Sequence, residues 1–317
     1  MDKLRIGLVG CGGRGRGHLS YLKEFDDVEL VALCDVSTEA LKTTGDKFGV
    51  PNRYADLDQM LTEVTLDAVF VATPVLHNAP TALRCLEKGI NTLLEKPPGI
   101  KVKETIALRD VANRTGAKAM VGWNRRFHPI IVQAWEMIKA RGEVVQVVGE
   151  FHKSMARFEA AGRFPEAVMD TMLLESPIHA IDIVRAIANS DVVEVHSIVR
   201  RAYSRYRDVH GALIRFENGC VGHLIANYTS DARLERYEIH GRQISAYLEG
   251  VSHGVIFYDG QKRELTEAGS GGTREQNRYF LDCVKHDRPV TLPAANLDEA
   301  IKTMQLAEAI LVGERED

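Results

Sequence analysis

Cysteine is scarce and scattered in this chain of 317 residues. The five cysteines are Cys11, Cys34, Cys85, Cys220 and Cys283, and no two of them form a C-x-x-C pair. An odd number without paired spacing argues against a disulfide framework and a structural zinc site, and it favours a reducing cytoplasm. The chain also has no H-x-x-x-H or H-E-x-x-H pair, so we expect no metal site.

Long apolar runs and an excess of charge are missing as well. No stretch approaches the roughly 20 apolar residues that a membrane span needs, and the N-terminus lacks the apolar segment of a secretory signal. A formal net charge of −4 gives no electrostatic footprint for non-specific nucleic-acid binding. We therefore expect a cytoplasmic globular protein, long enough for two domains, with neither a membrane nor a nucleic acid as its partner.

The first third of the chain alternates short apolar runs with helical patterns. The expected strands are 4–9, 28–34, 67–72, 91–94 and 117–122, and the expected helices are 18–24, 38–48, 80–88 and 102–115. Nearly continuous apolar strands are typical of a parallel sheet with helices on both faces. The pattern predicts βαβ units and a doubly wound α/β domain over residues 1–123.

After residue 123 the pattern changes to a succession of strands. The expected elements are helices at 130–140 and 178–188 and strands at 144–151, 193–199, 212–216, 220–226, 237–240, 245–248 and 255–258. Glu217-Asn218-Gly219 is a hairpin signal between two of these strands. Residues 124–317 are thus predicted to form an α+β domain on a largely antiparallel sheet. This division leaves open whether the C-terminal helix packs back on the first domain.

The strongest local motif is Gly10-Cys11-Gly12-Gly13-Arg14-Gly15, between the first strand and the first helix. Gly10 permits a tight turn, Gly12 lets a pyrophosphate approach the backbone, and Gly15 lets the helix pack closely on the strand. The helix N-terminus then offers unpaired N–H groups to the phosphates. We expect Gly13 and Arg14 to take part in the same phosphate-binding turn. Another adenine-containing ligand such as FAD is an alternative occupant.

Asp35 follows the second strand, twenty residues after Gly15. A carboxylate at this place can accept hydrogen bonds from the adenosine ribose hydroxyls, and it repels a 2′-phosphate. The next residues, Val36 and Ser37, supply no arginine for such a phosphate. The sequence therefore favours NAD over NADP.

Two further strands end in polar residues. Glu95-Lys96-Pro97 follows one buried strand, and Thr73-Pro74 with His77 follows another. In open α/β sheets this edge binds ligands, and burial could lower the pKa of the Lys96 ammonium enough for proton chemistry. A solvated lysine at a strand exit and a plain turn at Thr73 are the structural alternatives.

The other informative segment is Glu175-Ser176-Pro177-Ile178-His179. Ser176 is a good N-cap and Pro177 a good first helical residue, which places His179 in the first helical turn. The helix dipole there lowers the pKa of the imidazole from about 6.5, as a base that accepts an alcohol proton requires. Asp182 shares a helix face with His179 and could orient it. An ordinary structural histidine is the alternative.

Together these motifs resemble the Gfo/Idh/MocA oxidoreductase family, the group of glucose–fructose oxidoreductase and inositol dehydrogenase. The matching segments, in the family's order, are Gly10-x-Gly12-x-x-Gly15-x-x-His18, Asp35, Thr73-Pro74-x-x-His77, Glu95-Lys96-Pro97 and the segment from Val121 to Phe127. The resemblance implies a Rossmann domain followed by an open, mostly antiparallel sheet, with the active site between them. It also implies a homodimer or homotetramer formed through the exposed face of that sheet.

The resemblance also implies roles for individual residues. Lys96 would orient the substrate hydroxyl beside the nicotinamide, and His179 would be the general acid/base. Glu175 stands where the family usually has an aspartate, four residues before that histidine. We expect Asn124 and Arg126 to contact the substrate.

The leading hypothesis is an NAD-dependent dehydrogenase that acts on a secondary alcohol of a sugar, polyol or related carbohydrate. One alternative is an enzyme that uses tightly held NAD for glycosidic cleavage without net oxidation. Another is a non-catalytic regulator that binds NAD and a protein partner. The presence of both Lys96 and His179 argues against the regulator, since a sensor needs no proton relay.

Overall fold

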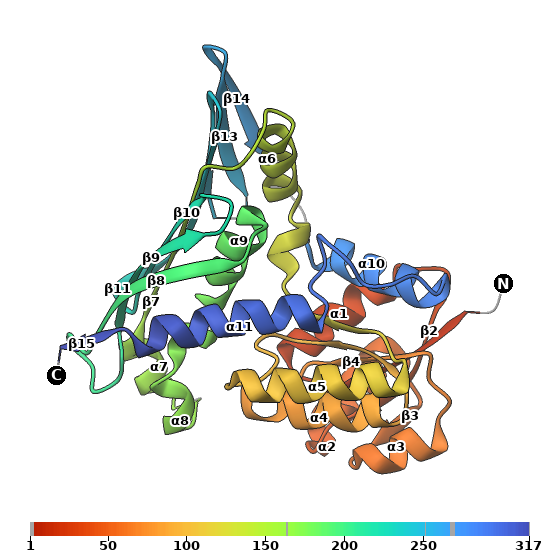
Figure 1. The fold of residues 1–317 in the computed structure, drawn as a ribbon. Helices are drawn as coiled ribbons and strands as arrows, with labels where there is room; N and C mark the ends of the chain where they lie inside the picture. The colour runs from red at the N-terminus through yellow and green to blue at the C-terminus, as the bar shows by residue number, and fades with distance from the viewer. Residues whose placement is uncertain (1–2, 163, 251, 267–269, 317) are drawn as a thin grey trace. The chain divides into compact units, whose positions relative to one another are not determined.

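A computed structural model describes residues 3–162, 164–250, 252–266 and 270–316 (Figure 1). The chain divides into two compact units. The first consists of Met1–Asn124 and Thr273–Ile301, and the second of Arg125–Gly272 and Lys302–Asp317. The first unit is therefore built from two segments that are far apart in the sequence.

The first unit is a parallel six-stranded sheet with the strand order β3-β2-β1-β4-β5-β6. Its strands are β1 (Leu4–Val9), β2 (Val28–Cys34), β3 (Asn52–Tyr54), β4 (Ala68–Val71), β5 (Asn91–Leu94) and β6 (Ala119–Val121). Its helices are α1 (Gly13–Leu22), α2 (Thr38–Phe48), α3 (Leu57–Glu63), α4 (Val75–Glu87), α5 (Val102–Thr115) and α10 (Thr273–Lys285). This strand order is that of a doubly wound dinucleotide-binding fold, so the predicted Rossmann sheet is confirmed.

Local sequence signals explain where the predictions for this unit were right and where they failed. The apolar strands β1, β2 and β5 and the helices α2 and α5 lie at the predicted residues. Strand β3 and helix α3 were missed, because three half-polar residues and one short helix give no clear periodicity. Helix α4 starts five residues earlier than predicted: Pro74 is its N-cap, and the helix runs through Pro80.

The second unit is a nine-stranded sheet with the order β14-β13-β12-β11-β7-β10-β9-β8-β15. Its strands are β7 (Gln146–Ser154), β8 (Val192–Arg200), β9 (Val209–Phe216), β10 (Val221–Asn227), β11 (Thr229–Gly241), β12 (Ile244–Glu249), β13 (His253–Tyr258), β14 (Gln261–Thr266) and β15 (Glu314–Glu316). Neighbouring strands are antiparallel except for the pairs β7–β10 and β8–β15. The predicted antiparallel sheet is confirmed, including the hairpin at Gly219.

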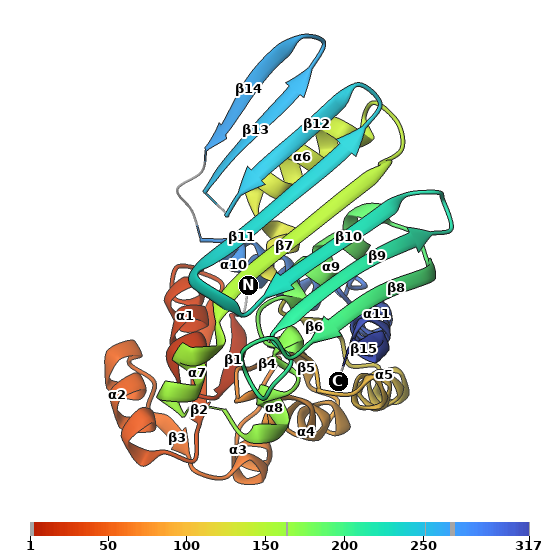
Figure 2. The same cartoon turned by 90° about the vertical axis from the view of Figure 1, so that its left-hand side faces the viewer.

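The helices of the second unit are α6 (Pro129–Lys139), α7 (Met155–Ala161), α8 (Glu166–Met169) and α9 (Ile178–Ala188), while α11 (Leu297–Val312) is shared between the two units. Short 3₁₀ turns occupy Asn124–Phe127 and Met172–Leu174. Helices α6 and α9 lie behind the sheet in Figure 2, and the strands present their other face to the viewer.

Helix α9 lies very close to the sheet because the strands that it packs on have glycines, Gly149 on β7 and Gly222 on β10, at the points of contact. A Cβ atom on Gly149 would lie 2.9 Å from Val184 Cγ2, and one on Gly222 would lie 2.8 Å from Val184 Cγ1. All residues of α9 are buried, which agrees with its mainly apolar sequence. The N-terminus of α9, with His179 in its first turn, is thereby fixed against β7 and β10.

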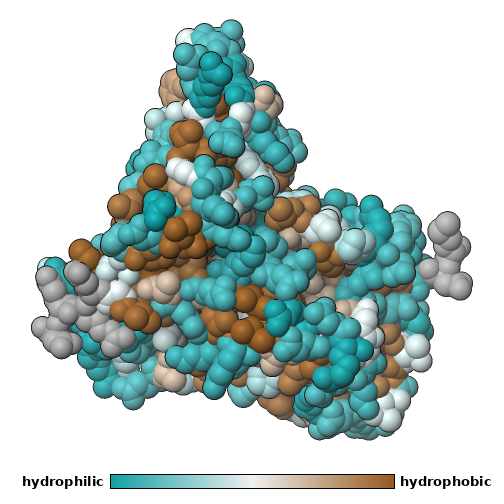
Figure 3. Space-filling model, in the orientation of Figure 1, coloured by the Kyte–Doolittle hydropathy of each residue, from teal (hydrophilic) through white to brown (hydrophobic). Residues whose placement is uncertain are grey.

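The visible surface is mainly hydrophilic, with hydrophobic residues gathered in small patches (Figure 3). Within the described ranges, none of the helices has the length and apolar character that a membrane crossing requires.

Candidate functional site

The glycine-rich turn after β1 has the geometry that the motif predicts. Gly10 adopts a φ of +96°, and a Cβ atom there would lie 2.4 Å from the Ala72 carbonyl oxygen. A Cβ atom on Gly15 would lie 1.9 Å from the carbonyl oxygen of Gly10. Gly12 and Gly13 are exposed, and a Cβ atom on either would meet nothing within 4 Å. The close approaches thus fall where helix meets strand, and the open backbone falls where a phosphate would approach.

Asp35 lies directly beside this turn. Its Oδ2 accepts a hydrogen bond from the Cys11 backbone N–H at 2.7 Å, and its Oδ1 accepts one from the Ser37 N–H at 2.8 Å. These two bonds fix a partly exposed carboxylate next to the glycine turn. Cys11 itself is buried, and burial together with the Asp35 charge raises the pKa of its thiol to about 12. Asp35 and the glycines therefore fit the ribose and pyrophosphate of a dinucleotide.

Glu95 is a buried carboxylate that connects the glycine turn to the end of β5. Its Oε1 accepts hydrogen bonds from Arg14 Nε at 2.6 Å and from His18 Nε2 at 2.9 Å. Gly122 leaves room for it, since a Cβ atom there would lie 2.9 Å from Glu95 Oε1. Burial raises the pKa of Glu95, but the Arg14 charge and the His18 hydrogen bond outweigh it and lower the pKa to about 2.

His18 joins this cluster to the second segment of the unit. Its Nδ1 lies 2.9 Å from Asn277 Oδ1 on α10, and its ring packs against Phe70 of β4 with ring centroids 5.4 Å apart. Arg14 Nη1 also donates to the Thr273 hydroxyl at 3.3 Å. The start of α10 therefore completes the polar cluster around Glu95.

Asn78, which the sequence did not single out, fixes the backbone on both sides of Lys96. Its Nδ2 donates to the carbonyl oxygens of Glu95 and Pro97, each at 3.2 Å. Thr73 orients this amide, because its hydroxyl donates to Asn78 Oδ1 at 2.9 Å. The Thr73 hydroxyl thus has a positioning contact. No local pattern distinguishes Asn78 from an ordinary helical asparagine.

The remaining predicted residues of the first unit lie near the same strand ends. Pro74 and His77 are exposed at the start of α4, and Lys96 is half-buried. Asn124 Nδ2 donates to the Thr273 hydroxyl at 3.4 Å, so it lies beside Arg14 in this unit.

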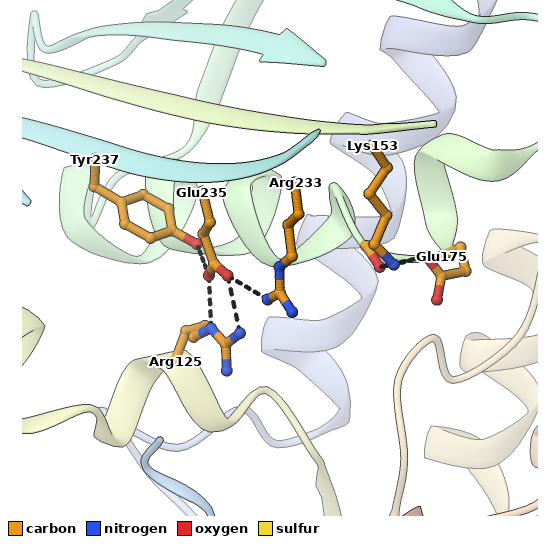
Figure 4. Close-up of polar contacts among 7 residues, drawn as sticks. Arg125, Lys153, Glu175, Arg233, Glu235 and Tyr237 are labelled. Atoms are coloured by element: carbon orange, nitrogen blue, oxygen red, sulfur yellow. Dashed lines mark hydrogen bonds and ion pairs between the residues drawn. The ribbon is translucent and has the colours of Figure 1, made fainter. Parts of the chain in front are cut away.

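His179 lies at the second position of α9, in the second unit. The predicted N-cap is wrong: the cap residue is Pro177, and the Ser176 side chain makes no capping bond. The Ser176 hydroxyl instead donates to Glu175 Oε2 and accepts from Lys153 Nζ at 2.6 Å. Lys153 Nζ also donates to Glu175 Oε2 at 3.1 Å (Figure 4). The side chains just before His179 are therefore tied to the end of β7.

Arg126 and Asp182 form a fully buried ion pair. Arg126 Nε and Nη2 donate to the two carboxylate oxygens at 2.8 and 2.7 Å, and Thr303 donates to Asp182 Oδ1 at 3.0 Å. The side chains of Arg126 and Asp182 are 1% and 0% exposed. The sequence predicted a substrate contact for Arg126 and an orienting role for Asp182. The geometry shows both holding the 3₁₀ turn of Asn124–Phe127 to α9.

The sequence did not predict a second ionic cluster in this unit, two of whose residues lie on the first part of β11, which begins eight residues earlier than predicted. Arg125 donates from Nε and Nη2 to the two oxygens of Glu235 at 2.6 and 2.9 Å, and the Tyr237 hydroxyl donates to Oε1 at 2.9 Å. Arg233 Nη2 donates to Oε2 at 2.8 Å (Figure 4). The sequence carried a signal only for the neighbouring Lys153, which continues the inward-facing series Val147, Gly149, Phe151 on the alternating strand β7.

The structure thus brings the predicted residues together in two groups, one in each unit. The glycine turn, Asp35, Thr73, Glu95, Lys96 and Asn124 belong to the first unit, and Arg126, Glu175 and His179 belong to the second. In the described part of the chain, no three His, Cys, Asp or Glu side chains come together as metal ligands would.

Both parts of the chain match the same family of known proteins. Residues 4–123 match a family described as an oxidoreductase family with an NAD-binding Rossmann fold, and residues 131–247 match the GFO/IDH/MocA C-terminal domain. The chain is 25% identical to D-apiose dehydrogenase of Paraburkholderia graminis, over 100% of this chain and 89% of that protein. It is 26% identical to myo-inositol 2-dehydrogenase of Thermotoga maritima, over 75% of this chain and 74% of that protein.

Solved structures share the fold. An oxidoreductase from Agrobacterium radiobacter, in complex with NAD+, L-tartaric acid and magnesium, superposes with a TM-score of 0.83 at 19% identity. The superposition covers 97% of this chain and 95% of that one. Both sheets of the present chain therefore have counterparts in a protein of known structure.

The low pKa of Glu95 predicts how the free energy of unfolding depends on pH. Its pKa falls from 4.5 to about 2 on folding, so ionised Glu95 stabilises the fold above pH 4.5, and this contribution is lost as the pH falls toward 2. We expect the free energy of unfolding of the wild type to fall more steeply over this range than that of Glu95→Gln. Urea titrations at a series of pH values measure the difference, and parallel curves would contradict it.

Proposed function

Since the chain belongs to the Gfo/Idh/MocA family of NAD-binding oxidoreductases, we propose that it is an NAD-dependent dehydrogenase of carbohydrate alcohols. Its substrate is a secondary hydroxyl of a sugar, a polyol or a related carbohydrate. The relatives named as D-apiose and myo-inositol dehydrogenases support this class of substrate.

The observation that carries the proposal is the Arg14–Glu95 contact of 2.6 Å. Through it, the open glycine turn and the Glu95-Lys96-Pro97 segment are fixed beside each other at the carboxyl ends of β1 and β5. That edge is where open parallel sheets bind their ligands. The same edge of the sheet can therefore bind a dinucleotide at the glycine turn and a substrate hydroxyl at Lys96.

Bound NAD would supply the hydride acceptor, held by the backbone of Gly12 and Gly13 and by Asp35. The Lys96 ammonium donates a hydrogen bond to the reacting hydroxyl oxygen and stabilises the negative charge that develops on it. The His179 imidazole accepts the hydroxyl proton. Glu175, kept in place by Lys153 and Ser176, favours the imidazolium that results.

Replacing the proposed base tests the proton step. His179→Ala should lower kcat by about 10² to 10⁴, because a positioned general base contributes that much, while the affinity for NAD stays unchanged. NADH formation across sugars and polyols measures the first quantity, and calorimetric titration with NAD measures the second. The exposed His286→Ala provides the control. Wild-type turnover in His179→Ala would contradict the assignment, and free sugar released without NADH would favour glycosidic cleavage.

Asp35 tests the choice of cofactor. Asp35→Asn keeps an oxygen that can accept from the Cys11 N–H but removes the charge that repels a 2′-phosphate. We expect the ratio of the Kd for NADP to the Kd for NAD to fall about tenfold. Titration calorimetry with both dinucleotides measures it, with the exposed Asp26→Asn as control. An unchanged ratio, or a wild type that prefers NADP, would reject the role of Asp35.

The open face of the nine-stranded sheet supports a homodimer or homotetramer. Strand alternation places a set of exposed apolar side chains on this one face: Ile198, Leu213, Ile225, Leu234, Tyr247 and Phe257. Exposed apolar patches of this kind mark protein interfaces. We propose that a second copy of the chain covers them.

Light scattering coupled to size exclusion tests this assembly. We expect a dimer or tetramer for the wild type and smaller particles for Ile225→Glu, because a buried unpaired carboxylate is costly at an interface. The control is Tyr203→Glu, at an apolar residue that is 92% exposed and lies outside the strands. A monomeric wild type would disprove the assembly.

A further inference from the structure

Two cationic side chains, Lys153 of β7 and Arg233 of β11, come from neighbouring strands of the second unit. Lys153 lies two residues after the inward-facing Phe151 on β7, and the guanidinium of Arg233, on β11, lies over the Phe151 ring. Figure 4 shows the two side chains extending to the same side, Arg233 toward Glu235 and Lys153 toward Glu175. Like charges next to each other on a sheet are unfavourable unless an anion lies near both.

In the described contacts, these cations and Arg125 outnumber the carboxylates that they meet. Glu235 is shared, since its two oxygens accept from both nitrogens of buried Arg125 and from Arg233. Glu175 is the carboxylate that Lys153 contacts. In the contacts of the described residues, Arg125, Arg233 and Lys153 thus meet two carboxylates, one fewer than the number of cations.

Both cations are held in place and remain accessible. The Arg233 guanidinium lies over the Phe151 ring at 5.4 Å from its centroid, and the Lys153 ammonium lies over the Phe158 ring at 5.0 Å. The Arg233 side chain is nevertheless 56% exposed, so guanidinium donors remain available to a ligand. Lys153 also contacts Ser176, three residues before His179, which places the pair beside the proposed proton acceptor.

We propose that Lys153 and Arg233 form a subsite for a carboxylate on the substrate, so that the carbohydrate oxidised is a sugar acid or a related hydroxy acid. This inference rests on the proposed function and narrows its substrate class. A single carboxylate matches the charge of the one additional cation. A phosphate dianion exceeds that charge and would meet Glu175 and Glu235 at close range. Arg233 supplies the planar donor pair that binds a carboxylate in two hydrogen bonds.

The test compares matched acids and neutral alcohols. Calorimetric titrations in saturating NADH, which prevents oxidation, would use D-gluconate against D-glucitol, L-tartrate against L-threitol, and D-galacturonate against D-galactose. We expect at least one acid to bind about tenfold more tightly than its neutral partner. Lys153→Met and Arg233→Met should each reduce that preference about tenfold, and Lys153→Arg should retain it.

Arg236→Met is the matched control. Arg236 lies on the same strand but on the opposite face, where it contacts Glu238 and Glu150, so its loss should leave the preference intact. The inference is overturned if no acid binds more tightly than its neutral partner. This includes the case in which both bind equally tightly and the case in which neither binds. The inference is also overturned if the preference survives in both variants. Tighter binding of D-glucitol 6-phosphate than of D-gluconate would contradict the assignment of this subsite to a carboxylate.

This outcome is separable from failure of the proposed function. Oxidation of neutral polyols without any preference for acids would contradict the carboxylate subsite alone. Preferred binding of an acid, with no NADH formed from any alcohol, would contradict the dehydrogenase and leave the subsite in place.

Discussion

The buried carboxylate of Glu95 is the constraint on which the first unit depends. It accepts from Arg14 of the glycine turn and from His18 of α1, and it stands directly before Lys96. Burying a charge is costly unless it is paired and hydrogen-bonded, and here Arg14 of the proposed cofactor-binding turn and His18 meet both requirements. The arrangement of the site and the stability of the fold thus share the same contacts.

The second unit uses ionic contacts in a different way. The Arg126–Asp182 pair is sealed, and it fixes a 3₁₀ turn to the helix that carries His179. The cluster around Glu235 is only partly sealed, because Arg125 is buried while Arg233 remains half-exposed. A closed pair contributes to geometry alone, whereas an open one can also exchange partners with a ligand.

Much of the fold could be predicted because its signals are local. Helices α5 and α9 were predicted at 102–115 and 178–188, where they lie, since α5 shows an apolar period and α9 a mainly apolar run of helical length. Strand β3 could not be predicted, because three residues carry no period. The prediction of Ser176 as an N-cap was wrong because its hydroxyl binds Glu175 and Lys153 instead of the helix backbone.

The site was predictable only in part for the same reason. The glycines and the Glu-Lys-Pro triplet are contiguous motifs, so the sequence alone located them. The contacts of His18 with Asn277 and of Lys153 with Ser176 join residues that are 259 and 23 positions apart. Which side chains meet across such separations depends on strand register and packing, and local patterns do not specify either.

The first unit takes one of its helices from near the end of the chain, and this has a consequence for biosynthesis. Helix α10 supplies Asn277 to His18 and packs Phe280 against Phe70, with ring centroids 5.9 Å apart. During translation, the first 124 residues leave the ribosome long before Thr273 is made. Until α10 is made, the nascent Rossmann sheet therefore exposes the apolar surface that this helix covers. A fragment ending at Asn124 would expose the same surface.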